Sequence, residues 1–248
     1  MASVMSRHAL RMAVACALAL SLLAASGGVT KESITFDGKR HEYFLFVPDR
    51  AAGSGPAPML MLLHGSGHDG RSLADPWKKL AAQEGLILVA PSSQNPALWQ
   101  SPLDGPKALI AIANAVKEQY GADPNRIYLF GHSAGAVFAL YMSVWEPQYF
   151  AAIAIHAGST TAQEESELRK VLPDLARKTP IQIQVGTRDP FFPLPAVRAT
   201  RDLFSAAGFT IDLREIPEHD HNYYVVSDRI NREAWTFLRE KRLNTDSR

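Results

Sequence analysis

The chain has 248 residues but only one cysteine, Cys16, which lies in an apolar run near the N-terminus. If that run is removed, no thiol remains, which excludes disulfides, thiol nucleophiles and cysteine-bound zinc from the rest of the chain. A domain of this length can bury a sizeable core without disulfides. The scarcity of cysteine is therefore compatible with export into an oxidising compartment.

The sequence also lacks any block of one charge. It holds 26 Lys and Arg against 25 Asp and Glu, with no basic run and no acidic tail, which argues against a nucleic-acid partner. Internal repeats, low-complexity segments and long linkers are absent as well. With 46% hydrophobic and 21% charged residues, the composition is typical of a globular protein.

The first 26 residues differ from the rest. "MASVMSRHALR" carries Arg7 and Arg11 without an acid, residues 12–25 are uncharged and mostly apolar, and "AASGG" then supplies small residues. This layout predicts a signal peptide over residues 1–26 and a mature domain over residues 27–248, secreted or periplasmic. The alternative is an uncleaved anchor, but the apolar run is short for a membrane span. We therefore expect no stable membrane insertion after signal removal.

Beyond residue 55, short apolar segments alternate with helical ones, which predicts a mostly parallel sheet covered on both faces. Before them, "ESITFDG" and "HEYFLFVP" read as an antiparallel hairpin turning at Asp37 and Gly38. The expected strands cover residues 58–65, 86–91, 126–131, 150–159, 180–186 and 209–217. Only about twenty residues separate the strands ending at 159 and beginning at 180, so no large lid is expected.

The central motif is "YLFGHSAG", residues 128–135, in which Gly131, Ser133 and Gly135 form a G-x-S-x-G pattern. An apolar strand runs into the motif and an apolar helix leaves it, which is the setting of a nucleophile elbow. The alternative is an ordinary strand–helix turn that favours Gly and Ser. In the elbow interpretation, the Ser133 hydroxyl faces the crevice at the carboxyl ends of the strands.

A serine nucleophile needs a base, and the base needs an acid that orients it. On this architecture the chain order is Ser, then Asp or Glu, then His. Asp189 follows a buried strand in "QVGTRDPFFP", whereas Asp174 and Asp202 sit in helix-like segments. After the last strand, "EHDHNYY" supplies two candidates for the base, His219 and His221.

The oxyanion of an acyl-transfer reaction needs hydrogen-bond donors. The backbone N–H of Ala134, just after the nucleophile, is one candidate. The second is the N–H of Ser66 in the glycine-rich "HGSGHDG" loop, with Gly67 as an alternative. His64 and His68 in that loop, together with His219 and His221, also raise the hypothesis of a metal site. The glycines of the loop disfavour it, because they argue against the helix on which a histidine pair four residues apart would bind a metal. We predict no metal and no cofactor.

These motifs resemble the α/β-hydrolase superfamily, and within it the secreted poly(3-hydroxybutyrate) depolymerase and feruloyl or acetylxylan esterase-like group. The resemblance rests on "LLHGSG", the W…D stretch at residues 99–104, "DPNRIYLFGHSAG", "VGTRDPFFP" and the histidine loop. It implies an α/β-hydrolase fold and a triad of Ser133, Asp189 and a loop histidine. In this group an aromatic residue commonly follows the catalytic histidine two positions on, which favours His221, followed by Tyr223, over His219.

Four further side chains are candidates for the substrate pocket: Trp99, His132, Phe191 and Tyr223. An equally good interpretation of the aromatic ones is that they pack on the core. His156, in an apolar strand, is interpreted as structural.

The sequence thus predicts a secreted serine carboxylesterase acting on a small-molecule or polymer ester. The alternatives are an amidase or peptidase on the same triad, or a non-catalytic binding protein on a hydrolase scaffold.

Overall fold

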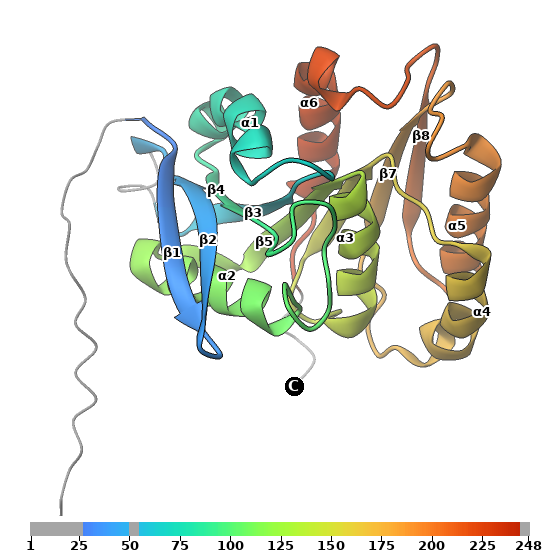
Figure 1. Ribbon diagram of the computed structural model, residues 1–248, viewed down its shortest axis with the longest axis horizontal. Coiled ribbons are helices and arrows are strands. Elements are labelled where there is room, and N and C mark those ends of the chain that lie inside the picture. Colours follow the sequence, from blue (N-terminus) through green and yellow to red (C-terminus); the bar gives the residue numbers. More distant parts are fainter. Residues whose placement is uncertain (1–26, 50–54, 244–248) are drawn as a thin grey trace, which may run out of the picture.

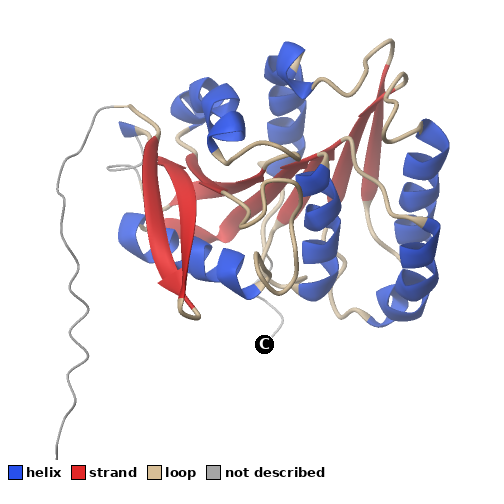
Figure 2. Cartoon of the chain, viewed as in Figure 1, coloured by secondary structure: helices blue, strands red, loops and turns tan. Residues whose placement is uncertain are grey.

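The computed structural model describes residues 27–49 and 55–243, so the signal peptide predicted over residues 1–26 lies outside the described residues. Within them, a single eight-stranded sheet crosses the molecule and helices flank it (Figures 1 and 2). The strands are β1 Thr30–Phe36, β2 Lys39–Phe46, β3 Ala57–Leu63, β4 Ile87–Pro91, β5 Ala122–His132, β6 Ala152–His156, β7 Ile181–Gly186 and β8 Ile211–Ile216. The helices are α1 Arg71–Glu84, α2 Lys107–Tyr120, α3 Ala134–Trp145, α4 Ala162–Val171, α5 Leu194–Ala206 and α6 Ser227–Leu238, with short 3₁₀ turns η2 Leu172–Asp174 and η3 Tyr223–Val225.

The strand order is β1-β2-β4-β3-β5-β6-β7-β8. Pairing is antiparallel between β1 and β2 and between β2 and β4, and parallel from β4 through β8. The hairpin turns at Asp37 and Gly38, whose φ values of 49° and 71° match the positive φ that a tight hairpin turn requires. The predicted mostly parallel sheet with an N-terminal antiparallel hairpin is confirmed.

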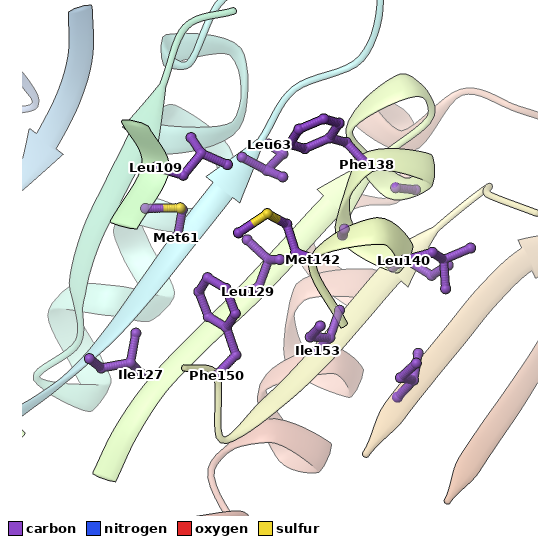
Figure 3. Packing of buried hydrophobic residues seen from close by; sticks show 14 of the residues in the cluster. Met61, Leu63, Leu109, Ile127, Leu129, Phe138, Leu140, Met142, Phe150 and Ile153 are labelled. Atoms are coloured by element: carbon purple, nitrogen blue, oxygen red, sulfur yellow. The ribbon is translucent and has the colours of Figure 1, made fainter. Parts of the chain in front are cut away.

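Helices cover both faces of the sheet, as predicted. Side chains of α1 and α6 pack on one face, and those of α2, α3 and α5 pack on the other (Figure 1). On the second face, Figure 3 shows Phe138 and Met142 of α3 beside Leu63 of β3 and Leu129 of β5. Because α3 buries most of its surface, the turn that precedes it is held between a rigid helix and the centre of the sheet.

Glycines end two of the helices. α1 stops before Gly85 and α2 before Gly121, and both glycines adopt the left-handed conformation with φ of 66° and 63°. Glycine enters this region without the steric penalty that a Cβ would impose, which is why it is common at helix C-termini.

β5 begins earlier than predicted, at Ala122 instead of residue 126. Its pairing with β3 shifts register there, because Ala57 pairs with Ala122 while Met59 pairs with Ile127. Pro124 lies in this irregular part, consistent with the rule that proline is tolerated in strands only at edges and bulges. Because Pro124 precedes the apolar run, the sequence pattern did not predict the pairing of Ala57 with Ala122.

Within residues 27–49 and 55–243, no helix is long and apolar enough to cross a membrane. The connection between β6 and β7 holds only α4, η2 and short loops, so the expected absence of a large lid agrees with the described residues.

Candidate active site

Ser133 lies on a sharp, strained turn between β5 and α3. Its φ of 55° and ψ of −120° are sparsely populated for a residue with a side chain. The neighbouring glycines explain how the chain closes so tightly: a Cβ at Gly131 would meet the Gly135 carbonyl oxygen at 2.3 Å, and one at Gly135 would meet the Leu63 carbonyl oxygen at 2.0 Å. Any side chain at either glycine would force the turn open, so the G-x-S-x-G pattern here is a geometric requirement.

Three side chains from three different loops meet at this turn. Ser133 Oγ lies 3.0 Å from His221 Nε2, and His221 Nδ1 lies 2.8 Å from Asp189 Oδ2. The loops follow β5, β8 and β7, which are parallel, so their carboxyl ends reach the same edge of the sheet. The structure therefore brings together the serine, the acid and one of the two histidines that the sequence selected.

Asp189 is held as an oriented carboxylate. Its Oδ1 accepts hydrogen bonds from the backbone N–H groups of Phe191 (2.8 Å) and Phe192 (2.9 Å), while Oδ2 faces His221. Burial opposes ionisation, but the hydrogen bonds from His221, Phe192 and Phe191 outweigh it and hold the pKa of Asp189 below its ordinary value. A buried anion at this place favours the His221 tautomer with a proton on Nδ1, which leaves Nε2 free to accept the Ser133 proton.

The His219 side chain contacts His156, and among the described residues it makes no hydrogen bond to Ser133 or Asp189, although it is only two residues from His221. A Cβ at Gly186 would meet the His219 carbonyl oxygen at 2.1 Å, so the chain at His219 passes directly over the end of β7. The His219 carbonyl also accepts the Arg188 N–H at 2.9 Å. With its backbone anchored there, the loop delivers His221 to the serine.

The loop after β3 borders the same crevice. Ser66 is exposed beside Ser133, and Ala134 is the first residue of α3, where backbone N–H groups have no partner within the helix. The buried imidazole of His64 braces this loop: Nε2 accepts the Ser93 N–H at 3.1 Å, so Nδ1 donates to the Gly65 carbonyl at 2.8 Å. Burial lowers the pKa of His64, which favours the neutral form that this pairing needs.

The crevice has a volume of about 470 Å³, within the range of sites for small ligands. Three of the four predicted pocket residues border it, namely His132, Phe191 and Tyr223. Phe191 is 71% exposed and its ring lies edge-on to His221 at 4.9 Å between centroids, so it forms an apolar rim. Tyr223, in contrast, is fully buried, and its hydroxyl donates to Asn231 at 2.6 Å, so it supports the wall from behind.

Trp99 does not line the crevice, contrary to expectation. Its ring is buried between His64 and Phe138, and its Nε1–H donates to the His64 carbonyl at 2.9 Å. The nearby Asp104 accepts the backbone N–H groups of Gln94 and Gln100, at 2.6 and 2.7 Å, and closes the loop that carries Trp99. The W…D stretch therefore organises the loop behind Ser66. This role results from packing in the folded protein, so amino-acid composition does not predict it.

His156, which the sequence analysis interpreted as structural, is buried under the crevice beside His132. His156 of β6 contacts His132 on one side and His219 on the other, and all three side chains are buried. The contact between His132 and His156 follows from the register of the sheet, in which these two residues pair, so a correct prediction of the register would have revealed it. Among the described residues, no group of three or more His, Cys, Asp and Glu side chains is arranged to hold a metal ion.

An eight-stranded sheet of this order, with a serine on a strained turn after the central strand β5, defines an α/β-hydrolase. The sequence profile of the Dienelactone hydrolase family matches residues 97–240. The chain belongs to this family.

Individual relatives agree with this assignment. The poly(3-hydroxybutyrate) depolymerase of Ralstonia pickettii is 30% identical over 104 residues, which cover 35% of this chain and 21% of that protein. Acetylxylan esterase A of Aspergillus ficuum is 29% identical over 139 residues, covering 52% of this chain and 46% of that protein. The chain thus spans less than half the length of either relative.

Among solved structures, an S-formylglutathione hydrolase from Agrobacterium tumefaciens superposes with a TM-score of 0.67 at 20% identity. The match covers 91% of this chain and 99% of that one, and it supports the fold. The resemblance inferred from the motifs, to the α/β-hydrolase superfamily and its depolymerase and esterase group, is confirmed.

Proposed function

We propose that this chain is a secreted serine carboxylesterase, with residues 27–248 as its single catalytic domain. The observation that carries the proposal is the continuous contact from Ser133 Oγ through His221 to the buried Asp189 carboxylate, at 3.0 and 2.8 Å. This arrangement is the one that activates a serine hydroxyl for acyl transfer. The family and its relatives, which include an acetylxylan esterase, point to carboxylic ester hydrolysis.

In the proposed reaction, His221 Nε2 takes the Ser133 proton while Oγ attacks the ester carbonyl carbon. The N–H groups of Ala134 and Ser66 hydrogen-bond the oxyanion that forms. The carbon–oxygen bond to the alcohol then breaks, and the alcohol leaves with the proton from His221. Water, deprotonated by the same histidine, hydrolyses the acyl-enzyme and restores Ser133. Asp189 keeps the imidazole oriented and stabilises its charged form.

The proposed substrate is a small or polymeric ester. The crevice is open, and the exposed Phe191 gives one side of it an apolar surface on which an acyl or aromatic group can rest. No metal or cofactor takes part, because histidine activates the nucleophile and backbone amides stabilise the charge.

The test compares p-nitrophenyl acetate with an aminoacyl p-nitroanilide, using the purified mature protein and a Ser133→Ala variant as control. We expect ester turnover that the Ser133→Ala variant loses by at least about 10⁴-fold. Turnover of the amide without the ester would reassign the protein as an amidase. Folded protein that cleaves neither substrate, and whose Ser133 does not react with a fluorophosphonate probe, would favour a non-catalytic binding role.

A further inference from the structure

A row of three buried histidines lies under the catalytic residues and outside the proposed reaction. His132 Nδ1 is 3.0 Å from His156 Nδ1, and His156 Nε2 is 3.2 Å from His219 Nε2. His132 and His156 are cross-strand neighbours on β5 and β6, and His219 comes from the loop after β8. The row therefore connects His132, which directly precedes the nucleophile in the sequence, with His219, which lies two residues before His221.

The nitrogens of the row do not converge on one point, which disfavours a metal site. His156 uses one ring nitrogen toward each neighbour, so neither lone pair is free for a common ion. The contacts instead have the lengths of N–H···N hydrogen bonds. Each such bond needs one donor and one acceptor, and a neutral imidazole offers one of each.

Neutrality is the favoured state of all three rings. Burial, with the neighbouring His221, lowers the pKa of His132 to about 3, and burial also depresses the pKa values of His156 and His219. Since each ring then carries one proton, the direction of one hydrogen bond fixes the direction of the other. The row has two states, one with every N–H directed toward the crevice and one with every N–H directed away from it.

The crevice end of the row is the Nε2 edge of His132. Its Nδ1 is engaged by His156, and among the described residues Nε2 has no hydrogen-bond partner. This edge faces Gly65 of the loop after β3, since a Cβ at Gly65 would lie 3.2 Å from His132 Cδ2 and 3.6 Å from Nε2. His132 and Gly65 both border the crevice beside Ser133, and the His132 ring lies 5.1 Å from that of His221.

We propose that His132 is a substrate-binding donor whose Nε2–H hydrogen-bonds an ester oxygen, and that His156 and His219 are positioning residues that hold it in this tautomer. The ester oxygens accept hydrogen bonds and cannot donate them, so only the state with N–H groups directed toward the crevice gains a bond from the substrate. In that state His219 Nε2–H donates to His156, and His156 Nδ1–H donates to His132. The inference rests on the proposed esterase function for its substrate, but the order of protons along the row can be measured without turnover.

The first test is nitrogen NMR of the imidazole side chains in the folded Ser133→Ala protein near neutral pH, with an excess of an ester that this variant cannot cleave. We expect protons on His132 Nε2, His156 Nδ1 and His219 Nε2, and none on their partners across each contact. A proton on His132 Nδ1, or a doubly protonated ring in the row, would overturn the proposal. This outcome is separable from the proposed function, because a protein that cleaves no ester would fail the activity assay and still report its tautomers.

The second test is kinetic and uses His132→Leu, His156→Leu and His156→Asn. Loss of one neutral hydrogen bond predicts a fall in kcat/KM for esters of about five- to tenfold in both leucine variants. His156→Asn should recover most of it, because its amide can donate to His132 Nδ1. The matched control is Gln182→Leu, which replaces a buried polar side chain on the same face of the sheet that contacts none of the three histidines.

Unchanged kcat/KM in His132→Leu would contradict the donor role. Equal loss in His156→Asn and His156→Leu, with the Gln182→Leu variant unaffected, would contradict the positioning role. Should His156→Leu fail to fold, the spectra of the Ser133→Ala protein still decide the question.

Discussion

At the scale of single residues, the site depends on how little space surrounds Ser133. Gly131 and Gly135 let the backbone close within van der Waals distance of its neighbours, and Gly186 does the same for the His219 backbone. These three glycines set the positions of the nucleophile and of the histidine loop. The reactivity of Ser133 therefore depends on three glycines that take no direct part in the reaction.

The two histidines of "EHDHNYY" should differ sharply when each is replaced. His221→Ala removes the only imidazole in contact with both Ser133 and Asp189 among the described residues, and we expect kcat for p-nitrophenyl acetate to fall by about 10⁴-fold or more. His219→Ala should keep activity within about tenfold, because it loses at most one hydrogen bond of the row. Near-normal turnover in His221→Ala together with loss in His219→Ala would reverse the assignment.

Buried neutral histidines also predict how stability depends on pH. The pKa values of His64, His132, His156 and His219 are all lowered, so in the window between about 6.5 and the folded values the unfolded chain binds more protons than the folded one. The free energy of unfolding should therefore fall as the pH drops below about 6.5, by up to about 1.4 kcal/mol per pH unit for each histidine, and for His132 down to about pH 3.

Urea unfolding over this range measures the effect, with His156→Leu as the comparison. We expect the free energy of unfolding of the variant to fall less steeply with decreasing pH, because the contribution of one buried histidine is removed. Identical slopes for the two proteins would mean that His156 does not remain neutral in the fold.

The sequence was sufficient for residues whose role follows from chain order, and insufficient for those whose role follows from packing. Ser133, Asp189 and the histidine loop follow parallel strands in a known order, so local patterns selected them. Trp99 was expected in the pocket because it is aromatic and predicted to lie near the mouth of the crevice, yet it is buried against His64. The contact of His132 with His156 depends on sheet register, which neither segment encodes alone.

At the scale of elements, α3 is the support for the nucleophile. It begins directly after Ser133, and eight of its twelve residues are buried, so the turn cannot move unless the helix leaves the core. Apolar periodicity predicted this helix and most strands within a few residues. It did not predict the start of β5, because Pro124 interrupts the pattern where the pairing with β3 shifts.

Two aromatic residues of α3 provide a matched comparison of burial. Phe138 is 4% exposed against Trp99 and the sheet, whereas Trp145 is 46% exposed and stacks on Tyr141. We expect Phe138→Ala to lower the free energy of unfolding by about 3–5 kcal/mol, since it leaves a cavity. Trp145→Ala should lose about 1 kcal/mol, the contribution of one aromatic pair. Equal losses in urea unfolding would contradict the described burial of α3.

At the scale of the whole molecule, the proposed export and the proposed activity depend on separate parts of the chain. Residues 27–243 contain every side chain of the candidate site, whereas the export signal is predicted over residues 1–26. Removal of that segment takes away Arg7 and Arg11 and no acid, which leaves 24 basic and 25 acidic residues. The mature chain would thus be close to neutral, so its composition gives no reason to expect a strongly charged surface.

Expression of the full chain in a secreting bacterial host tests the export proposal. We expect the protein outside the inner membrane, with an N-terminus near residue 27 as measured by intact mass. A chain that starts at residue 27 should stay in the cytoplasm and serves as the control. Recovery of the uncleaved chain from the membrane fraction would support the alternative of an N-terminal anchor.

The most direct measurement of the central proposal is covalent labelling by a fluorophosphonate, in which the activated serine oxygen attacks phosphorus and fluoride leaves. We expect one adduct per folded chain, on the peptide that contains Ser133. It should be absent from Ser133→Ala and strongly slowed in His221→Ala. Folded protein that hydrolyses esters but carries no adduct on Ser133, or carries it on another residue, would contradict the assignment of Ser133 as the nucleophile.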